Sequence, residues 1–473
     1  MLCRYTAEMD VQPQSFREYD IRGVVGSELT PETGRAVGLV FAVYLADAGI
    51  HGPVAVGRDN RPSGAGLRDA LVGALVESGI DVLDIGVVPT PTLYWALEKL
   101  GPAGGIQITA SHNPAEYNGF KVCVGTHALY GDDIQRLLTL IRQGRHVTNA
   151  PPGTVRQEPV LDRYTDDIVT RIGTLPRQLS VVLDCANGVG SLVGPTLLRR
   201  LGVSATCLLC ESDGTFPKRQ PDPSQAKNLA DLQAAVRQAA QAGRAVDAGI
   251  ALDGDADRIG LVDAAGEIIW GDRVLAIYAR DVLSKPAHKG APIIFDVQSS
   301  QALANAVTAA GGKPVMWKTG HSLIEAKMRE IGSPLAGELS GHMYIADDYY
   351  GYDDALYAAA RLLSIMASTG RGVRQLLAGV PEYPVSPQLR VDCADDVKFG
   401  IVEHAVAHWS ADHEVTTVDG ARVQFGDGWG LIRASNTQPA LVLRFEARTP
   451  ERLAAIQTEM ESWLRQQGVD MAG

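Results

Sequence analysis

Three strand-like apolar runs in this chain are each followed by a polar loop with a serine and then by a helix-like stretch. The runs are Pro53–Gly57, Leu179–Leu183 and Pro292–Phe295, and their loops read RDNRPS, DCANGVGS and DVQSS. Buried strands that alternate with alanine- and leucine-rich helical segments are typical of α/β architecture. Because the three units lie far apart along the chain, they indicate repeated domains rather than a solenoid.

The domain organisation follows from length and from breaks in the pattern. A chain of 473 residues exceeds what one hydrophobic core covers. Proline-rich segments at Thr148–Pro159, Ser284–Pro292 and Pro381–Pro387 indicate breaks, and a closing helix is expected at Pro450–Gln466. We expect an α/β fold of three similar mixed α/β domains plus a smaller C-terminal α+β domain around a central cleft. The expected domains are residues 1–155, 156–265, 266–381 and 382–473.

Charge and composition exclude several classes of function. A net charge of −12 argues against a nucleic-acid surface. The apolar stretch Ala36–Ala46 is too short to cross a bilayer, and the N-terminus has no signal-peptide core. Cys207 and Cys210 form a CxxC pair within ATCLLC, which favours a buried strand over a redox or zinc site. We therefore expect a cytoplasmic protein with free thiols, no membrane partner and no nucleic-acid partner.

The segment Thr109–Lys121, TASHNPAEYNGFK, follows a probable strand at Gly105–Ile108. It is either an ordinary turn or the carrier of a nucleophile, Ser111. Neighbouring side chains in extended backbone point to opposite sides, so a simple pair of Ser111 with His112 is not expected. Activation of the serine by a metal and nearby cations is the better hypothesis.

The segment Leu252–Gly260, LDGDADRIG, indicates a metal site. Asp253, Asp255 and Asp257 alternate, so an extended loop would place all three carboxylates on one side. Such close like charges favour Mg²⁺, a hard cation that prefers oxygen ligands. A calcium loop of the EF-hand type is excluded, because Arg258 and Ala264 stand where glycine and glutamate are required. Arg258 could reach a phosphate held by the metal.

Two further loops and the N-terminal region carry polar groups suited to a sugar phosphate. In GELSGH, Glu338 and Ser340 could hold sugar hydroxyls and His342 could act as acid or base, although a glycine-rich turn is the alternative. In Arg433–Pro439, RASNTQP, the donors could surround a phosphate, although a polar hairpin turn is the alternative. More cations come from Arg17–Gly23 and from Arg58.

Together these segments closely resemble the α-D-phosphohexomutase superfamily, in particular its bacterial phosphomannomutase/phosphoglucomutase group. The resemblance runs nearly end to end, through FREYDIRG, TASHNP, DGDADR, GELSGH, YYGYDDALYAAARLL and RASNTQP. Any one of these motifs is weak alone, but the set in this order is highly specific.

The resemblance implies a role for each matching position. Ser111 would carry the phosphate, Asp253, Asp255 and Asp257 would bind Mg²⁺ with a phosphate oxygen, and Glu338 and Ser340 would hold the hexose. The phosphate that is not transferred would be held by Arg433, Ser435, Asn436 and Thr437. General acid and base roles lie among Tyr19, Arg22, Lys121 and His342, and active-site segments of the family also match Arg258 and His321. Relatives often carry a lysine where this chain has Gln298, so a charged contact there would be lost.

The implied reaction exchanges hexose 1-phosphate and hexose 6-phosphate, of mannose, glucose or both, through a phosphoserine and a hexose 1,6-bisphosphate. The partner would be a small sugar phosphate. Two alternatives stay open: a sugar-phosphate phosphatase and a non-catalytic paralogue that senses sugar phosphates. GELSGH fits the glucose and mannose group better than the glucosamine group, but the sequence does not decide between glucose and mannose. It does not give the oligomeric state either.

Overall fold

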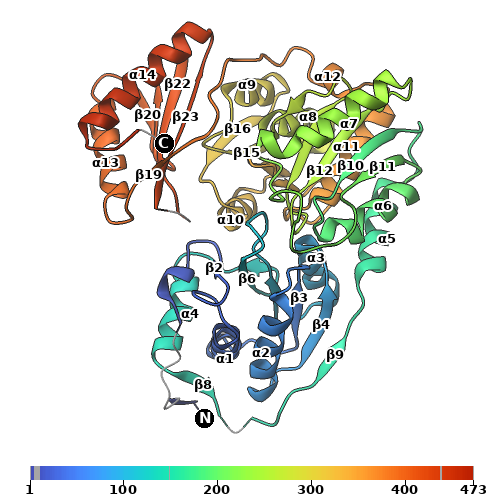
Figure 1. The fold of residues 1–473 in the computed structure, drawn as a ribbon, viewed down its shortest axis with the longest axis vertical. Helices are drawn as coiled ribbons and strands as arrows, with labels where there is room; N and C mark the ends of the chain where they lie inside the picture. The colour runs from blue at the N-terminus through green and yellow to red at the C-terminus, as the bar shows by residue number, and fades with distance from the viewer. Residues whose placement is uncertain (1, 5–10, 149, 437–438, 472–473) are drawn as a thin grey trace.

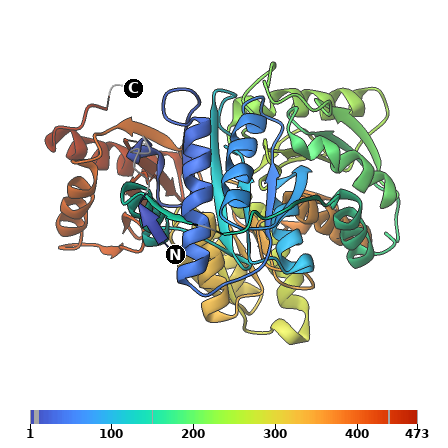
Figure 2. The same cartoon turned by 90° about the horizontal axis from the view of Figure 1, so that it is seen from below.

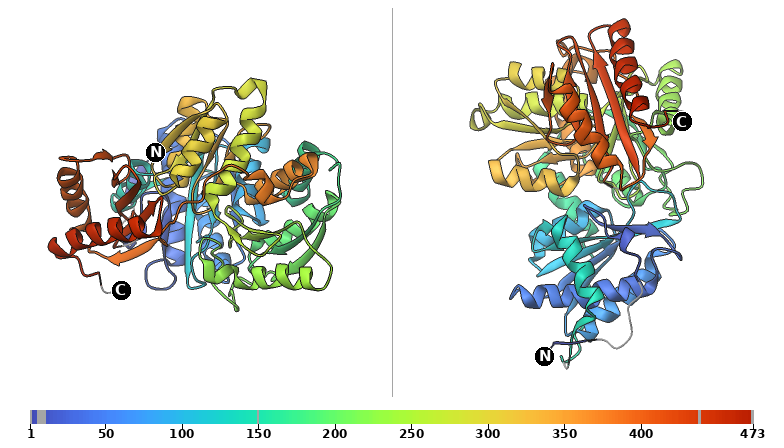
Figure 3. Two further views of the ribbon diagram at one scale, coloured as in Figure 1. Left: turned by 90° about the horizontal axis from the view of Figure 1, so that it is seen from above. Right: turned by 90° about the vertical axis from the view of Figure 1, so that its left-hand side faces the viewer.

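Four domains follow one another along the chain in the computed structural model, which describes residues 2–4, 11–148, 150–436 and 439–471 (Figure 1). Domain 3 lies between domain 2 and domain 4, which are on opposite sides of the molecule (Figures 2 and 3). Domain 1 lies beneath the other three in Figure 1. The prediction of three mixed α/β domains followed by a smaller one is confirmed.

Domain 1 contains a seven-stranded sheet and a separate pair of short strands, β1 and β8. Its main sheet has the order β2-β6-β5-β3-β4-β9, with β7 paired to β6. The capping box of Thr30 and Thr33, with Pro31 at the first helical position, fixes the start of α1. The elements are β1 Leu2–Arg4, β2 Ile21–Val24, α1 Pro31–Asp47, β3 Val54–Arg58, α2 Gly64–Glu77, β4 Val82–Val87, α3 Thr90–Leu100, β5 Gly104–Ile108, β6 Tyr117–Val124, β7 His127–Ala128, α4 Asp132–Arg142, β8 Arg145–Val147 and β9 Val155–Gln157, with a 3-10 turn at Pro13–Ser15.

Domain 2 contains a five-stranded sheet in the order β11-β10-β12-β13-β14. Its strands are β10 Ser180–Asp184, β11 Ser204–Leu208, β12 Ala248–Leu252, β13 Ile259–Asp263 and β14 Ile268–Ile269. Its helices are α5 Leu161–Ile172, α6 Gly194–Arg200 and α7 Ala230–Gln241, with 3-10 turns at Val189–Leu192 and Ala226–Leu229.

Domain 3 contains a four-stranded sheet in the order β16-β15-β17-β18. Its strands are β15 Pro292–Asp296, β16 Lys313–Trp317, β17 Leu335–Gly337 and β18 Met343–Ile345. Its helices are α8 Gly271–Ser284, α9 Gln301–Ala309, α10 His321–Ile331, α11 Ala355–Thr369 and α12 Val373–Leu376, with a 3-10 turn at Pro286–His288. The predicted break at Ser284–Pro292 does not separate two sheets, because it joins α8 to β15 within this domain.

The three sheets share one strand arrangement. In each, a central strand (β3, β10 or β15) pairs in parallel with two neighbours, and the second neighbour (β5, β12 or β17) pairs with an antiparallel strand (β6, β13 or β18). The central strands lie within one residue of the predicted runs. The connections from β5 to β6, β12 to β13 and β17 to β18 carry TASHNP, DGDADR and GELSGH. The three predicted loops therefore occupy the same topological position in three domains.

Domain 4 contains an antiparallel sheet in the order β19-β23-β22-β21-β20, covered on one face by two helices. On the other face, Val297 of domain 3 packs against Trp429 and Leu431. Arg422 extends this contact by donating to the carbonyls of Val297 and Ser299 at 2.7 and 3.0 Å. The elements are β19 Leu389–Asp392, α13 Lys398–Trp409, β20 Glu414–Thr416, β21 Ala421–Gln424, β22 Gly428–Ala434, β23 Ala440–Ala447 and α14 Pro450–Gln466. The helix α14 has the predicted bounds.

Two packing features bear on the predictions from composition. A continuous apolar core joins domains 1, 2 and 3, and α11 lies within it. No helix in the described part of the chain is long and apolar enough to cross a membrane. The prediction of a buried strand at Cys207 and Cys210 is wrong, because β11 is at the edge of its sheet and Cys207 is exposed.

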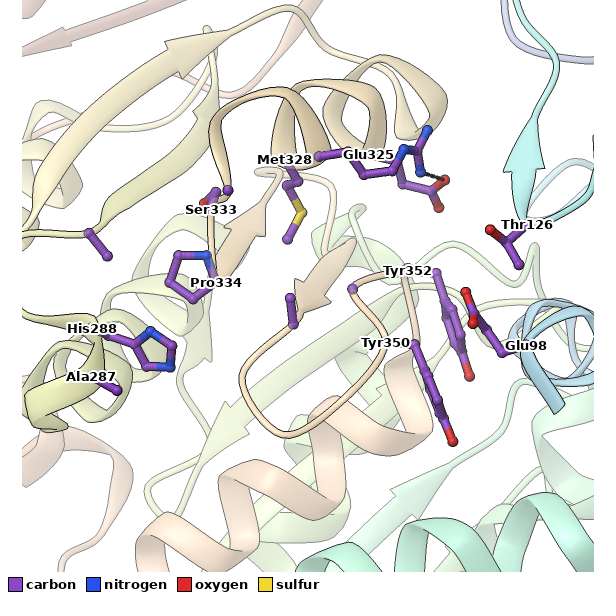
Figure 4. Close-up of a pocket in the computed structure, with 15 residues that line it drawn as sticks. Glu98, Thr126, Ala287, His288, Glu325, Met328, Ser333, Pro334, Tyr350 and Tyr352 are labelled. Atoms are coloured by element: carbon purple, nitrogen blue, oxygen red, sulfur yellow. Dashed lines mark ion pairs between the residues drawn. The ribbon is translucent and has the colours of Figure 1, made fainter.

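A cavity of about 480 Å³ lies between domain 1 and domain 3 (Figure 4). Glu98 and Thr126 line it from domain 1, and Glu325 and Tyr352 line it from domain 3. Glu325 is only 4% exposed, and its Oε1 has no hydrogen-bond partner among the residues described. Burial, reinforced by Asp353, raises the pKa of Glu325 to about 8.

This raised pKa predicts a pH-dependent stability. A carboxyl group whose pKa is about 8 when folded and 4.5 when unfolded binds more protons in the folded chain between those values. The contribution of Glu325 to stability therefore falls as pH rises from about 4.5 to about 8. We expect Glu325→Gln to flatten the dependence of the melting temperature on pH in this range. Glu330→Gln, on the exposed side of the same helix, should leave it unchanged. Equal slopes for wild type and Glu325→Gln would contradict the assignment.

Candidate active site

Ser111 lies at the contact between domain 1 and domain 2. Its side chain is buried, and its Oγ donates a hydrogen bond to Oδ2 of Asp253 at 2.7 Å. The backbones touch as well, because a Cβ on Gly254 would lie 2.3 Å from the Ser111 carbonyl oxygen. Only glycine fits this approach. The structure therefore brings the predicted nucleophile and the first predicted metal ligand into direct contact.

The backbone at Ser111 has a left-handed φ of 49°, which is uncommon for a residue with a side chain. In this conformation the side chains of Ser111 and His112 do not alternate, and Oγ lies 3.1 Å from Nδ1 of His112. The expectation that these side chains point apart is wrong, since it assumed extended backbone. Burial, followed by the nearby arginines, holds the pKa of His112 well below its usual range.

Arg61 holds the serine loop, and the sequence analysis did not identify it. Its guanidinium donates to the carbonyl oxygens of Ser111 at 2.9 Å and Asn113 at 2.7 Å, and to two more carbonyls of the loop. Its charge is balanced by Asp59 at 2.9 Å, and both side chains are fully buried. The sequence feature that could have identified it is the close spacing of Asp59 and Arg61 in RDNRPS, a segment that also precedes a helix.

The carboxylates of Asp253, Asp255 and Asp257 gather within 4.8 Å of one another, and all three are fully buried. The loop is a turn rather than the extended segment expected, with a left-handed φ of 61° at Ala256. Oδ1 of Asp253 accepts from the backbone N–H groups of Asp257 and Arg258 at 3.0 and 3.1 Å. The predicted convergence thus occurs, but by a turn that folds back on its first aspartate.

These aspartates fit a divalent cation. Within the described residues, Oδ1 of Asp255 and Oδ1 of Asp257 are buried without hydrogen-bond partners. Burial and then the charges of Asp257 and Asp255 raise the pKa of Asp253 well above its usual range. Burial by itself would also raise the pKa of Asp257, but Lys121, His342 and Arg258 outweigh it and hold that pKa low. Since oxygen ligands and negative charge are both in excess, the group could bind a metal ion.

Lys121 and Arg258 supply positive charge around the aspartates. Nζ of Lys121 forms ion pairs with Asp257 and with Asp255, the latter at 3.4 Å. Nε of Arg258 donates to Nε2 of His342 at 2.9 Å, which links domain 2 to domain 3. Burial lowers the pKa of His342. These residues predicted from separate motifs form one connected cluster.

Arg22 and Tyr19 approach this cluster from the N-terminal segment. Nη1 of Arg22 donates to Oδ1 of Asn113 in the serine loop at 3.0 Å. Tyr19 donates to the carbonyl oxygen of Thr319 at 2.7 Å and accepts from Nδ2 of Asn436 at 2.6 Å. Tyr19 therefore joins three domains through one hydroxyl group.

The sugar-binding candidates lie in domain 3. Oε1 of Glu338 accepts a hydrogen bond from the backbone N–H of Gly320 at 2.7 Å. The GELSGH loop therefore holds the residue that immediately precedes His321. His321 lies edge-on to Tyr19, with ring centroids 6.2 Å apart. Ser340 is half-buried in the turn, and its hydroxyl makes no hydrogen bond within the residues that the structure describes. The structure brings Glu338 and His321 together and leaves the Ser340 hydroxyl available to a ligand.

The domain 4 loop is the turn of the β22–β23 hairpin. Nε of Arg433 donates to Asp419 at 2.6 Å, and the Ser435 carbonyl oxygen accepts from Lys398. Thr437, the last predicted phosphate contact, lies outside the described residues. The sequence analysis did not identify Arg390. Burial lowers the pKa of its guanidinium, and the positive charges of Arg258 and Arg433 lower it further. Domains 2 and 4 thus present arginines to the same region.

Gln298 lies at the contact between domain 3 and domain 4. Its Nε2 donates to Asp296 at 3.2 Å, and its Oε1 accepts from Gln388. The amide is buried and forms a bridge between the two domains. The neutral residue is therefore part of the domain contact.

The buried pair of Arg61 and Asp59 predicts a large loss of stability on substitution. Arg61→Ala leaves the buried carboxylate of Asp59 without its counter-charge and removes the donor to four carbonyl oxygens, so the free energy of unfolding should fall by about 3–5 kcal/mol. The matched control is Arg35→Ala, whose ion pair with Glu77 is exposed and should cost less than about 1 kcal/mol. Urea unfolding measures both. Similar losses in the two variants would show that Arg61 does not hold the loop.

Models of the phosphoglucomutase/phosphomannomutase domains match this chain in order. Alpha/beta/alpha domain I matches residues 13–145, domain II residues 162–266, domain III residues 270–383, and the C-terminal domain residues 389–462. Together they cover most of the chain.

Relatives match over nearly their full length. A phosphomannomutase/phosphoglucomutase of Pseudomonas putida is 44% identical over 93% of each chain. A phosphoglucomutase of Neisseria gonorrhoeae is 40% identical over 94% of this chain and 96% of its own. The crystal structure of a phosphoglucomutase/phosphomannomutase family protein from Burkholderia thailandensis has a TM-score of 0.89 at 40% identity and covers 98% of this chain and 99% of that one. The chain belongs to the phosphoglucomutase/phosphomannomutase family.

Proposed function

We propose that this protein is a phosphohexomutase that interconverts the 1-phosphate and 6-phosphate of mannose, glucose or both. The observation that carries the proposal is the hydrogen bond from Ser111 to Asp253 within the group of three aspartates. A hydroxyl held against a site for a divalent cation is suited to carry a phosphoryl group. The names of the most similar relatives support the same reaction class.

Asp253, Asp255 and Asp257 would hold Mg²⁺, which when bound would draw negative charge from the oxygens of the transferring phosphoryl group. Lys121 and Arg258 supply further positive charge at the same place. Because phosphoryl transfer depends mainly on alignment and charge neutralisation, these residues would supply the positive charge that the transfer needs.

In the proposed reaction, a free hydroxyl of the hexose monophosphate attacks the phosphorus of phosphoserine 111. The bond from phosphorus to Oγ of Ser111 breaks, and the proton of the sugar hydroxyl is carried to Oγ by a base of the cluster, for which His342 is the candidate once its Nε2 is released from Arg258. The product is a hexose 1,6-bisphosphate. It turns end for end and returns its other phosphoryl group to Ser111, while the same base carries the Ser111 hydroxyl proton to the leaving sugar oxygen.

The remaining predicted residues are proposed to hold the sugar phosphate. Glu338 and Ser340 would contact the hexose hydroxyls, and Tyr19, Arg22 and His321 would border the reacting end. Arg433, Ser435, Asn436 and Thr437 would hold the phosphate that is not transferred. These four residues would contact the phosphate and not the sugar, which suits a substrate that binds in two orientations. Domain 4, which carries them, would close over the substrate and open for the turn.

The central prediction concerns Ser111. Ser111→Ala removes the only oxygen proposed to carry the phosphoryl group, so the rate of conversion of mannose 1-phosphate or glucose 1-phosphate should fall by at least about 1,000-fold. Ser27→Ala, at an exposed serine of the same domain, should leave the rate unchanged. Mass spectrometry of the wild-type protein should find phosphate on the peptide with Ser111.

The same assay separates the mutase from its alternatives. Release of free phosphate in place of the isomer would show a phosphatase. Wild-type turnover by a folded Ser111→Ala protein would reject the phosphoserine mechanism. Sugar binding without phosphate on Ser111 and without turnover would indicate a sensing paralogue.

A further inference from the structure

Two cysteine thiols of domain 2 lie against each other outside the catalytic cluster. Sγ of Cys210 is 3.2 Å from Sγ of Cys185, and both are free thiols. Cys185 directly follows β10, and Cys210 lies two residues after the end of β11; the two strands pair in parallel. The cysteine that contacts Cys210 across the strands is therefore not the CxxC partner that the sequence singled out.

The two sulfurs are only slightly farther apart than the sulfurs of a disulfide bond. A disulfide bond is about 2.0 Å long, so the sulfurs need to approach by little more than about 1 Å. The backbone already joins the two segments, since the Cys185 N–H donates to the Leu208 carbonyl oxygen at 3.1 Å and the Asn187 N–H donates to that of Leu209 at 2.8 Å. The two cysteines can therefore be bridged without rearrangement of the sheet.

The two thiols also differ in exposure and acidity, so that one of them can react with an oxidant first and the other can then form the disulfide. Cys210 is half-buried at the sheet edge, where a small oxidant can reach it, and Cys185 is fully buried behind it. The hydrogen bond with Cys185, and to a smaller extent the interaction with Cys207, lowers the pKa of Cys210, whereas partial burial and the neighbouring Cys210 raise the pKa of Cys207 to about 11. Since the thiolate is the reactive form, Cys210 is the favoured first target.

We propose that Cys185 and Cys210 form an oxidation site that hydrogen peroxide converts to a disulfide. The sulfur of Cys210 attacks one peroxide oxygen, the O–O bond breaks, and water leaves once the departing oxygen takes a proton, which gives a sulfenic acid on Cys210. The sulfur of Cys185 then displaces that hydroxyl group as a second water, and the S–S bond forms. The two thiols lose two electrons and two protons in total, and the peroxide is reduced to two waters.

The segment after Cys185 connects this site to the metal loop. Ala186 and Asn187 both have a left-handed φ, at 47° and 59°, so the segment has little freedom to adjust. The Val189 N–H donates to the Gly254 carbonyl oxygen at 3.0 Å, and a Cβ on Gly188 would lie 2.6 Å from that same oxygen. A movement of Cys185 toward Cys210 is therefore transmitted to the turn that carries the aspartates.

The segment after Cys210 connects the site to the serine loop. Ser212 accepts from Nδ2 of Asn60 at 2.9 Å, and the same amide donates to the Asn187 carbonyl oxygen at 2.8 Å. Asn60 immediately precedes Arg61, which holds the backbone of Ser111. The segments that follow Cys185 and Cys210 thus each contact a loop of the active site.

Displacements of about 1 Å can reduce a catalytic rate by as much as about 100-fold. In a consequence that rests on the proposed function, we expect the disulfide to lower mutase turnover by about tenfold, reversibly.

The test treats the full-length protein with hydrogen peroxide, blocks the remaining thiols and maps disulfides by mass spectrometry of peptides. We expect a Cys185–Cys210 crosslink in wild type and in Cys207→Ser, and its absence in Cys210→Ser and Cys185→Ser. Cys207→Ser is the matched control, because Cys207 lies in the same CxxC segment but is exposed. Circular dichroism establishes that each variant is folded, and Cys210→Ser, at the less buried position, decides the outcome if Cys185→Ser does not fold.

The crosslink is measured without any assay of activity, so its failure is distinct from failure of the proposed function. A Cys207–Cys210 crosslink, or sulfenic and sulfinic acids on Cys210 without a crosslink, would overturn the oxidation site. A tenfold loss of turnover that dithiothreitol restores in wild type, and that Cys210→Ser does not show, supports the connection to the active site. Unchanged turnover in crosslinked protein would overturn that connection.

Discussion

The burial of three carboxylates in one turn is the constraint on which the rest of the structure depends. Asp253, Asp255 and Asp257 lie within 4.8 Å of one another, away from solvent, where like charges repel strongly. Lys121 and Arg258 compensate part of this charge, and the two carboxylate oxygens without partners indicate a place for a divalent cation. A serine hydroxyl placed against this group lies where a phosphoryl group would be most strongly stabilised.

The repeated strand order explains how residues so distant in sequence reach this place. Each of the first three sheets sends the connection between its third parallel strand and its antiparallel strand toward the same region, and these connections carry the serine, the aspartates and the GELSGH loop. Domain 4 adds a hairpin loop through Asn436, which contacts Tyr19 of domain 1. One supersecondary arrangement, used three times, therefore supplies three different chemical groups. Domain 4 contacts domain 3 through a small apolar cluster, in which Val297 packs against Trp429 and Leu431, and through the hydrogen bonds of Arg422.

The sequence predicted the strands and the key loops because periodicity and turn chemistry are local properties. It indicated a metal site at the three aspartates because acidic residues so close together at a strand end repel without a counter-ion, and it proposed Ser111 because TASHNP follows a strand and resembles the family motif. It did not reveal the left-handed backbone at Ser111, which places His112 beside the hydroxyl, because that conformation depends on contacts with other domains. Arg61 was missed for a related reason. Its guanidinium binds backbone carbonyl groups, and since every residue has one, the sequence does not show which of them a side chain contacts. The exposure of Cys207 depends on which strand forms the sheet edge, which is also a tertiary property.

The most direct test of the account is the position of a divalent cation relative to Ser111. Crystals soaked in Mn²⁺, which takes the same oxygen ligands as Mg²⁺, would give an anomalous peak that locates the ion. The account predicts one peak at about 2.0–2.3 Å from carboxylate oxygens of Asp253, Asp255 and Asp257, with Oγ of Ser111 or its phosphate beside it. A peak instead among Asp257, His342 and Asp353, without contact to Asp253 and without Oγ of Ser111 or its phosphate beside it, would contradict it.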